Sequence, residues 1–351
     1  MKNHIIIGLM SGTSLDGLDI VACSFQKNSG GFFYKTYAAD TVVYDNNLKK
    51  RLADGHLSSA EELLKSDIDF GIFIGNSVLN FIKKHRLNNI FLIASHGHTI
   101  FHQPKNGFTF QIGNGATISK TTNISVVCDF RSGDVALNGQ GAPLVPIGDE
   151  FLFGNYDACL NLGGFSNISY KYKNKRIAYD ICPVNIILNK FANYFQKQYD
   201  EGGKIAETGK FIPELYEKLN KINFYNLKNP KSLSREWLEN VFMPVLDFYK
   251  NKPKADIMFT LIKHIAYQIS LALKGKKNVL ITGGGAFNNF LINSLKEVSK
   301  TEIIIPDKDL VMYKEAIVFA FLGYLRWNGE INCLSSVTGA DRDSCCGAVY
   351  L

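Results

Sequence analysis

The sequence predicts an α/β protein made of two related domains. Two segments each read as a β-strand, a glycine-rich turn and a return strand, and about 150 residues separate them. A third segment reads as a strand, a glycine loop and a helix. Strand and helix patterns alternate along much of the chain, which favours the α/β class. The repeated hairpin suggests two domains that face each other.

The first hairpin contains the segment 8–19, Gly-Leu-Met-Ser-Gly-Thr-Ser-Leu-Asp-Gly-Leu-Asp, after an apolar run. Its glycines and small hydroxyls predict a concave site rich in backbone donors, which suits phosphate oxygens. Asp16 and Asp19 could hold a metal ion or its waters. The turn is not a P-loop, because no Lys-Ser or Lys-Thr pair follows its last glycine. An ordinary hairpin with a long turn is the alternative interpretation.

The next elements are a strand, a helix and a buried strand. Residues 31–43 are rich in strand formers. Ser58 and Ser59 precede two glutamates at capping-box spacing, and apolar residues then predict an amphipathic helix to about His85. The buried strand 90–94 ends in the polar segment 95–99, where an α/β protein places ligand groups. His96 and His98 lie in this segment. A loop histidine that makes a hydrogen bond is favoured over a zinc ligand.

A strand over residues 124–128 delivers further charged residues into a loop. Arg131 could clamp a carboxylate or a phosphate, because its planar fork binds both oxygens. A structural ion pair with Asp129 or Asp134 is the alternative. The chain is expected to change domain near the loop 139–143.

The second hairpin has strands at 157–162 and 168–172 around the turn 163–167. The third glycine cluster, 282–285, follows a strand at 278–281 and opens a helix at 286–298, a geometry common in nucleotide binding. A purely structural explanation is strong for each turn alone and weaker for all three. Further helices are expected at 184–199, 255–273 and 313–327, and all three are assigned to the second domain.

Composition narrows the class of protein. The 351 residues are 46% hydrophobic and 20% charged, which is typical of a globular chain. The net charge of +7 is spread out, so nucleic acid is not expected as a partner. Seven cysteines without a C-x-x-C pair indicate reduced thiols in a cytoplasmic protein. No apolar run approaches the length of a membrane span.

The two hairpins and the late glycine loop together resemble the actin-like superfamily of sugar kinases and chaperone ATPases. Longer motifs narrow the resemblance to the anhydro-N-acetylmuramic acid kinases, and they follow the order of that family over nearly the whole chain. The matching segments are 8–19, 95–99, 129–131, 139–146, 161–164, 283–286 with Asn288, 315–316 and 336–340.

This resemblance implies two actin-like, ribonuclease H-like ATPase lobes around a central nucleotide and sugar cleft. We expect residues 1–130 and 330–351 in lobe one and residues 131–329 in lobe two. The implied enzyme uses ATP and Mg²⁺ to open 1,6-anhydro-N-acetylmuramic acid with water and phosphorylate its O6. The product, N-acetylmuramic acid 6-phosphate, belongs to peptidoglycan recycling. A homodimer is implied, with no membrane partner.

The resemblance also implies roles for individual residues. Asp180 matches the catalytic aspartate, and it could instead be a helix N-cap. Glu315 is a second candidate carboxylate near the sugar, unless it only complements a helix N-terminus. Asp16 and Asp19 are the metal candidates, and His96, His98, Thr99 and Arg131 are the sugar candidates. The nucleotide candidates are Gly12, Thr13, Ser14, Leu15, Asp16, Gly17, Leu18, Asp19, Asn161, Gly163, Gly164, Gly283, Gly284 and Gly285.

The chain departs from the family pattern beside Asp180. Ile181 replaces a threonine, and Cys182 and Val184 replace glycines, so their side chains could fill space that a ligand needs. His98 replaces a glutamine. A kinase of a different sugar or anhydro-sugar, and a nucleotide-binding homologue without turnover, therefore remain as alternatives.

Overall fold

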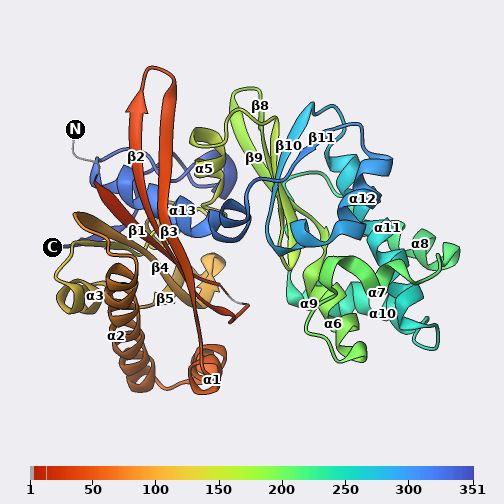
Figure 1. Ribbon diagram of the computed structural model, residues 1–351, viewed down its shortest axis with the longest axis horizontal. Coiled ribbons are helices and arrows are strands. Elements are labelled where there is room, and N and C mark those ends of the chain that lie inside the picture. Colours follow the sequence, from red (N-terminus) through yellow and green to blue (C-terminus); the bar gives the residue numbers. More distant parts are fainter. Residues whose placement is uncertain (1–3, 13) are drawn as a thin grey trace. The chain divides into compact units, whose positions relative to one another are not determined.

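The computed structural model describes residues 4–12 and 14–351, which form two compact units. The first unit contains the chain up to Leu152 together with Tyr313–Leu351, and the second is Phe153–Met312. The sequence analysis instead placed the boundaries at 130/131 and 329/330. The difference arises because helices α5 (Pro146–Phe151) and α13 (Lys308–Trp327) pack largely within the first unit (Figure 1).

The first unit is built on a seven-stranded sheet with the order β12-β6-β4-β1-β2-β3, and β5 pairs with β4. Strands β1, β2 and β3 form an antiparallel meander, whereas β4 runs parallel to β1 and β6 runs parallel to β4. The bounds are β1 (Ile5–Ser11), β2 (Gly17–Asn28), β3 (Gly31–Val43), β4 (Ile90–Gln103), β5 (Phe108–Ile112), β6 (Val126–Cys128) and β12 (Ala348–Tyr350).

Helix α2 (Ala60–Lys84) begins at the predicted capping box. The Ser59 hydroxyl accepts from the Glu62 amide, and the Glu62 carboxylate accepts from the Ser59 amide. Its buried residues, among them Phe70 and Ile74, join the core with the β1 and β2 side chains. The other helices of this unit are α1 (Asn46–Asp54), α3 (Gly115–Thr122), α4 (Ser132–Val135) and α14 (Ser335–Thr338).

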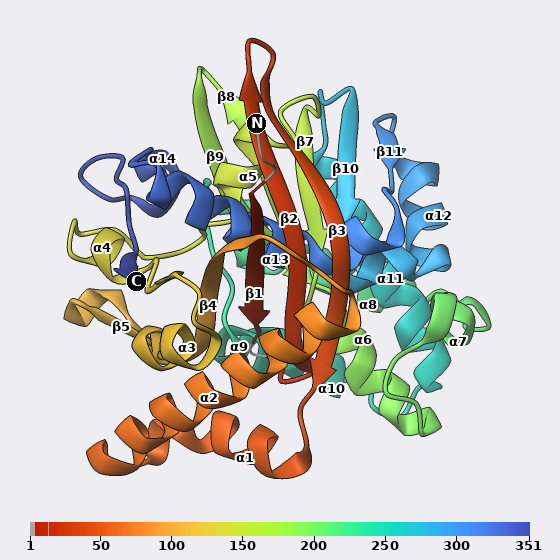
Figure 2. The ribbon, with the colours of Figure 1, turned by 60° about the vertical axis from the view of Figure 1, so that its left-hand side comes forward.

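Helix α13 lies directly on strand β1, as Figure 2 also shows. A Cβ added at Gly8 would lie 2.0 Å from the Ala316 carbonyl oxygen and 2.8 Å from the Ala320 side chain. Only glycine permits this approach. The prediction that this helix belongs to the second domain is therefore wrong.

The second unit contains a five-stranded sheet with the order β11-β10-β7-β8-β9. Strands β7, β8 and β9 are an antiparallel meander, and β10 and β11 continue parallel to β7. In the first unit, β6-β4-β1-β2-β3 have the same order and the same relative directions as β11-β10-β7-β8-β9. The two sheets therefore confirm the prediction of two related ribonuclease H-like α/β lobes. The bounds are β7 (Ala158–Leu162), β8 (Phe165–Tyr172), β9 (Lys175–Pro183), β10 (Asn278–Thr282) and β11 (Glu302–Ile304).

Helices of the second unit bury one continuous apolar core against its sheet. Residues 199–254 contribute Leu215, Leu219, Leu238 and Phe242 to that core. The helices are α6 (Asn185–Ala192), α7 (Lys204–Glu207), α8 (Pro213–Asn220), α9 (Arg235–Trp237), α10 (Met243–Asp247), α11 (Lys254–Ala272) and α12 (Asn289–Val298), with a π-helical turn at Leu238–Phe242.

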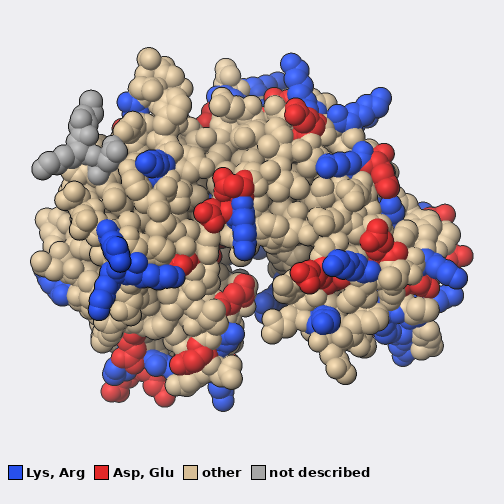
Figure 3. All heavy atoms as spheres, in the orientation of Figure 1, with Lys and Arg blue, Asp and Glu red and all other residues tan. Residues whose placement is uncertain are grey.

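The surface carries mixed charge. On the face in Figure 3, Lys and Arg side chains are interspersed with Asp and Glu. Within the described residues, no helix is long and apolar enough to cross a membrane.

Candidate functional site

The first glycine turn connects β1 and β2 in the first unit, as the hairpin pattern predicts. Ser11 pairs with Leu18, so the connection is short, and Leu15 adopts a positive φ of 61° while its amide donates to the Gly12 carbonyl. Ser14 and Asp16 are exposed on the turn, whereas Thr13 lies outside the described residues.

Two of the predicted nucleotide residues, Gly17 and Leu18, have structural reasons for their identity. A Cβ at Gly17 would lie 2.6 Å from the Val42 carbonyl oxygen, so the glycine allows β2 to approach β3. The Leu18 side chain is buried in the core. Any contact of these two residues with a ligand would have to use the backbone.

Carboxylates gather behind this turn. The Thr41 hydroxyl donates to Asp19 at 2.6 Å. Burial raises the pKa of Asp19 to about 6, the Thr41 hydrogen bond opposes the shift, and the charges of Glu315 and Asp16 add to it. The two predicted metal candidates and Glu315 therefore share one electrostatic environment.

Glu315 lies well inside helix α13, which begins at Lys308, so it is not a charge of the first helical turn. The alternative explanation from the helix dipole is wrong for this reason. Burial raises the pKa of Glu315, while Arg131 and Lys314 lower it. The neighbouring Lys314 forms a buried ion pair with Asp149 at 2.6 Å, which ties α13 to α5.

Arg131 is held in place by three hydrogen bonds. Its Nε and Nη2 lie 3.0 and 2.9 Å from His96 Nε2, and its Nη1 donates to the Gly141 carbonyl at 2.6 Å. Asp134 instead accepts from the Gly141 amide and the Thr338 hydroxyl. Within the described residues, Arg131 makes no ion pair with Asp129 or Asp134, so that alternative is wrong.

His96 supports the guanidinium as a neutral ring. Its Nδ1 lies 2.9 Å from the Gly97 carbonyl oxygen, which only accepts, so Nδ1 carries the proton and Nε2 accepts from Arg131. Burial and the charge of Arg131 hold the pKa of His96 well below its usual value. The expectation of a hydrogen-bonding histidine is confirmed here.

His98 lies in a separate hydrogen-bond chain. The Tyr44 hydroxyl donates to Ser11 Oγ at 2.6 Å, and Ser11 Oγ lies 2.9 Å from His98 Nδ1. Burial lowers the pKa of His98 to about 4, so the ring is neutral near pH 7. Tyr44 and Ser11 were not among the predicted site residues, and no local pattern marks Tyr44, which follows the end of β3.

The predicted end of the strand at Ala94 is wrong. Strand β4 continues to Gln103 because its polar half pairs with β1 as far as His98, which lies beside Ser11, and with β5 from His98 to Gln103. His96 and His98 are therefore strand residues rather than loop residues. Thr99 also lies in β4, half-buried and paired with Gln111.

In the second unit, the hairpin turn and the late glycine loop lie side by side. Asn161 of β7 pairs with Thr282 of β10, and an added Cβ at Gly283 would lie 2.4 Å from the Asn161 side-chain oxygen. A Cβ at Gly285 would lie 2.7 Å from Leu162 Cβ. The structure thus brings the two predicted nucleotide segments of this unit together.

Parts of these loops are open to a ligand. An added Cβ at Gly164 or Gly284 would lie 3.7 Å or more from every heavy atom of the described part of the chain, and both residues are exposed. The Thr282 hydroxyl beside them is buried and has no hydrogen-bond partner among the residues that the structure describes. Open glycine backbone and an unpaired hydroxyl fit an acceptor-rich group such as a nucleotide.

The predicted opening of a helix by the glycine cluster is wrong in detail. Residues Gly284–Phe287 form a 3₁₀ turn, and α12 begins only after Asn288, whose side chain accepts from the Leu291 amide. The helix N-terminus is thereby capped by its own chain.

Asp180 lies within β9 rather than at its end. It pairs with Asn167, its carboxylate accepts from the Leu233 amide at 2.8 Å, and its own amide donates to the Lys231 carbonyl. Burial raises the pKa of Asp180, and the Leu233 hydrogen bond opposes that shift. Helix α6 has Val184 at its N-cap position without a side-chain cap, so the capping role for Asp180 is wrong.

The side chains that depart from the family motif point into the core. Ile181, Cys182 and Val184 are all buried in the core of the second unit. The register shifts beside Ile181, and Ser166 Oγ accepts from the Cys182 amide at 3.2 Å across that irregularity. These side chains therefore do not project from the strand toward a ligand on its open side.

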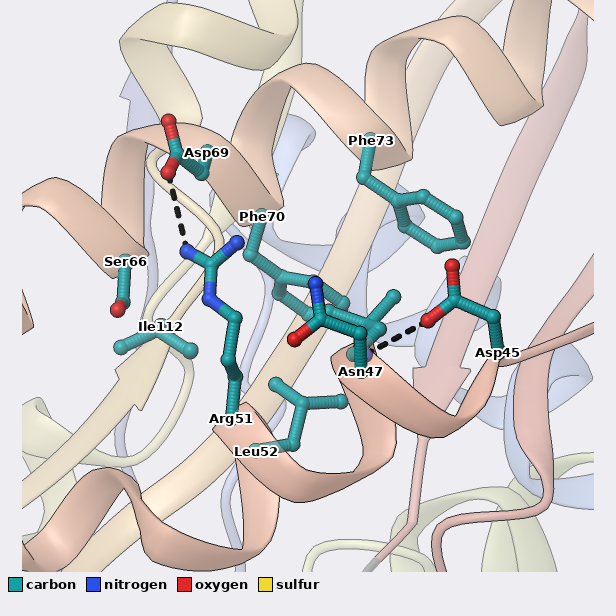
Figure 4. Close-up of a pocket in the computed structure, with 10 residues that line it drawn as sticks. Asp45, Asn47, Arg51, Leu52, Ser66, Asp69, Phe70, Phe73 and Ile112 are labelled. Carbon is teal, nitrogen blue, oxygen red and sulfur yellow. Dashed lines mark hydrogen bonds and ion pairs between the residues drawn. The ribbon is translucent and has the colours of Figure 1, made fainter.

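A separate hollow of about 200 Å³ lies between α1 and α2 (Figure 4). The Arg51–Asp69 ion pair of 3.0 Å spans it, and none of the predicted site residues that the structure describes lines it. Phe70 lies at its wall and also contacts the His98 ring, with centroids 6.3 Å apart.

Within the described residues, no group of three or more His, Cys, Asp and Glu could hold a metal ion alone. The Asp16 and Asp19 carboxylates are nevertheless hard oxygen donors. Mg²⁺ is commonly held by one or two carboxylates together with substrate phosphates, so this donor set fits that ion.

The protein has two ribonuclease H-like lobes, each with a glycine hairpin, and the half-buried carboxylate of Asp180. These features define the class of actin-like kinases and ATPases. Comparisons with known sequences give the family. A sequence model of the anhydro-N-acetylmuramic acid kinase family matches residues 4–351, and the chain belongs to that family.

Individual relatives cover the whole chain. The anhydro-N-acetylmuramic acid kinase of Hydrogenovibrio crunogenus is 35% identical over 99% of this chain and 98% of its own length. That of Francisella tularensis subsp. novicida is 35% identical over 95% of each chain. Among solved structures, component A of the Acidaminococcus fermentans (R)-2-hydroxyglutaryl-CoA dehydratase shares 15% identity at a TM-score of 0.46, covering 92% of this chain and 98% of its own.

Proposed function

We propose that this protein is an ATP-dependent kinase that converts 1,6-anhydro-N-acetylmuramic acid, ATP and water to N-acetylmuramic acid 6-phosphate. The match of the family to residues 4–351 supports this reaction. The observation that supports the chemical mechanism is the position of Asp180, which matches the family's catalytic aspartate. Its half-buried carboxylate is held by a hydrogen bond from the Leu233 amide.

Asp180 acts as the general base in this proposal. It removes a proton from the water that attacks the anomeric carbon, and the bridge oxygen leaves as O6. Burial raises the pKa of Asp180 in the direction of neutral pH. A general base is most effective when its pKa lies near the pH at which the enzyme works. O6 needs no separate acid, because the γ-phosphoryl group captures it.

The glycine turns are assigned to ATP. Gly12 and Ser14, with Thr13, belong to the first hairpin, and Asn161, Gly163 and Gly164 belong to the second. The loop Gly283–Gly285 is assigned to the adenosine side. Asp16 and Asp19 would hold Mg²⁺, which stabilises negative charge on the phosphoryl oxygens.

The sugar is assigned to Arg131 and its surroundings. The guanidinium, already oriented by His96, can bind the lactyl carboxylate of the muramic acid. Burial raises the pKa of Glu315, and the nearby charge of Arg131 opposes that shift. Glu315 is therefore assigned to the same region, with His98 and Thr99.

A kinase of a different sugar is the second candidate. One observation favours it: His98 replaces the family's glutamine and is a buried, neutral ring bonded to Ser11. Its hydrogen-bonding pattern differs from that of an amide, which can donate and accept at one end. This could alter selectivity without altering phosphoryl transfer.

The cellular setting follows from the reaction. We assign the enzyme to peptidoglycan recycling in the cytoplasm and expect a homodimer. Size-exclusion chromatography with light scattering measures the oligomeric state directly.

A coupled assay of ADP release tests the proposed reaction. The panel contains 1,6-anhydro-N-acetylmuramic acid, ordinary N-acetylmuramic acid and their glucosamine counterparts. We expect turnover with the anhydro muramic sugar far above the others. Higher turnover with another sugar would support the second candidate, and no turnover with any sugar would contradict both.

A further inference from the structure

A short stretch of chain, residues 231–233, borders strand β9 at Asp180. The Asp180 amide donates to the Lys231 carbonyl at 2.9 Å, and the Leu233 amide donates to Asp180 Oδ2 at 2.8 Å. The stretch therefore holds the candidate base both through its backbone and through its carboxylate. Because residues 231–233 belong to no helix or strand, other contacts have to fix their position.

The Lys231 side chain supplies such contacts. Its Nζ donates to the Phe224 carbonyl at 3.1 Å and to the Tyr225 carbonyl at 3.4 Å, and it lies 4.6 Å from the centroid of the Phe224 ring. Both carbonyls belong to the 3₁₀ turn Asn223–Asn226. A charged donor strengthens a hydrogen bond, and an aromatic ring attracts an ammonium group. The ammonium group therefore ties residues 231–233 to this turn.

The turn is itself fixed to helix α11 through Tyr225. The Tyr225 hydroxyl lies 2.9 Å from His264 Nε2, and His264 Nδ1 lies 2.7 Å from Asn220 Oδ1. Asn220 Oδ1 also accepts from the Gln268 side chain. Since an amide oxygen only accepts, the proton lies on His264 Nδ1, and Nε2 accepts from Tyr225. Burial lowers the pKa of His264 to about 3, so the neutral ring remains an acceptor near pH 7.

We propose that Lys231 is a positioning residue that anchors residues 231–233 and thereby holds the Asp180 carboxylate in the orientation needed for proton transfer. The anchor begins at His264 in the core and reaches the Lys231 ammonium group through Tyr225. From there the backbone carries it to the two hydrogen bonds on Asp180. The anchoring does not depend on what the enzyme phosphorylates, whereas its effect on catalysis rests on the proposed function.

Loss of the anchor should change catalysis in two ways. A misplacement of about 1 Å can cost about 10²-fold in rate, so we expect Lys231→Met to lower kcat by roughly 10- to 100-fold. The Leu233 hydrogen bond opposes the rise in the pKa of Asp180 that burial causes. When this hydrogen bond weakens, the pKa of Asp180 rises, and the acid limb of the profile of kcat against pH moves to higher pH. The KM values for ATP and for the sugar should stay nearly unchanged, because a positioning residue contacts neither substrate.

Hydrogen–deuterium exchange tests the anchor without reference to catalysis. The reporters are the amides of Asp180 and Leu233, which donate the two hydrogen bonds between β9 and residues 231–233. In Lys231→Met we expect both amides to exchange roughly tenfold faster than in the wild type, which corresponds to the loss of one hydrogen bond to a charged group. Lys228→Met is the matched control, because Lys228 is exposed in the same loop, and it should leave both rates unchanged.

Two further variants make the test specific. Lys231→Arg keeps a charged donor that can reach a carbonyl, so it should retain most of the wild-type kcat. Tyr225→Phe keeps the ring and the backbone carbonyls and removes the hydroxyl that binds His264. This change is milder than Lys231→Met and should raise the same two exchange rates several-fold. Melting temperatures are measured for all four variants to establish that each is folded.

Several results would overturn the positioning role of Lys231. Unchanged exchange of both amides in folded Lys231→Met would remove the anchor, and if that variant does not fold, unchanged exchange in Tyr225→Phe would do so. A raised KM for ATP or for the sugar at unchanged kcat would make Lys231 a substrate contact instead. A lowered kcat with an unshifted acid limb would also contradict the proposal. Absence of kinase activity in the wild-type enzyme would contradict the proposed function and leave the exchange result in force.

Discussion

Replacement of Arg131 by alanine should weaken binding of the muramic sugar and spare ATP. Of the five N–H donors of a guanidinium, Nε–H and one Nη2–H face His96, and one Nη1–H faces Gly141. One N–H therefore remains on each terminal nitrogen to bind a carboxylate. Hydrogen bonds to charged groups contribute about 1.5–3 kcal/mol, which corresponds to a KM increase of roughly 10- to 150-fold.

The assay compares two sugars that differ in the carboxylate. KM is measured for 1,6-anhydro-N-acetylmuramic acid and for its glucosamine counterpart, which lacks the lactyl group. Arg131→Ala should raise the first and leave the second nearly unchanged. Because the change also leaves His96 Nε2 and the Gly141 carbonyl without a donor, Arg131→Lys serves as a charged control. Equal losses for both sugars, or a loss that falls on ATP, would refute the assignment.

Three further predictions concern the remaining groups. Gly12→Val should abolish ATP binding without unfolding the protein, because the branched side chain fills the turn. Calorimetry measures the affinity for ATP, and an unchanged affinity would remove Gly12 from the site. Gly283→Ala should lower both stability and nucleotide affinity, because φ is +84° and the new Cβ would meet the Asn161 side chain. Gly284→Ala should be tolerated, since its Cβ would lie at an ordinary van der Waals distance from its neighbours. Equal effects of the two changes would contradict this geometry. The pKa of Asp19 rises on folding from 3.8 to about 6, so the native state binds the proton more tightly and its free energy of unfolding falls as pH rises from 4 to 6. Asp19→Asn should remove up to about 3 kcal/mol of that fall, as measured by urea unfolding at each pH, and an unaltered pH dependence would contradict the buried environment.

Much of the fold could be predicted from local patterns. The capping box at Ser59 and the three glycine segments are local signals, and the structure confirms the helix and the strands around them. The length of β4 could not be predicted in this way, because its polar half is fixed by pairing with β1 and β5 from distant parts of the chain. The domain boundaries failed for a similar reason, since the packing of α13 on Gly8 is a long-range contact.

The candidate site shows the same division. Motif resemblance pointed to Asp180, Arg131 and Glu315, and to the His96 ring that orients Arg131, but not to other supporting groups. The Leu233 amide that binds Asp180, the Tyr44 hydroxyl that donates to Ser11 beside His98, and the Asp149–Lys314 ion pair beside Glu315 were not among the predicted site groups. Their roles depend on tertiary packing, which no local spacing in the sequence reveals.

The turnover of Asp180→Asn with ATP and 1,6-anhydro-N-acetylmuramic acid tests the central claim most directly. Asparagine keeps an oxygen that can accept from the Leu233 amide, so the fold should remain stable, but its amide is a very poor base. A lost general base costs roughly 10²–10⁴-fold in rate. We predict a kcat reduced by that factor, with near-normal melting temperature and with both substrates still bound. A folded Asp180→Asn enzyme with wild-type turnover would contradict the account.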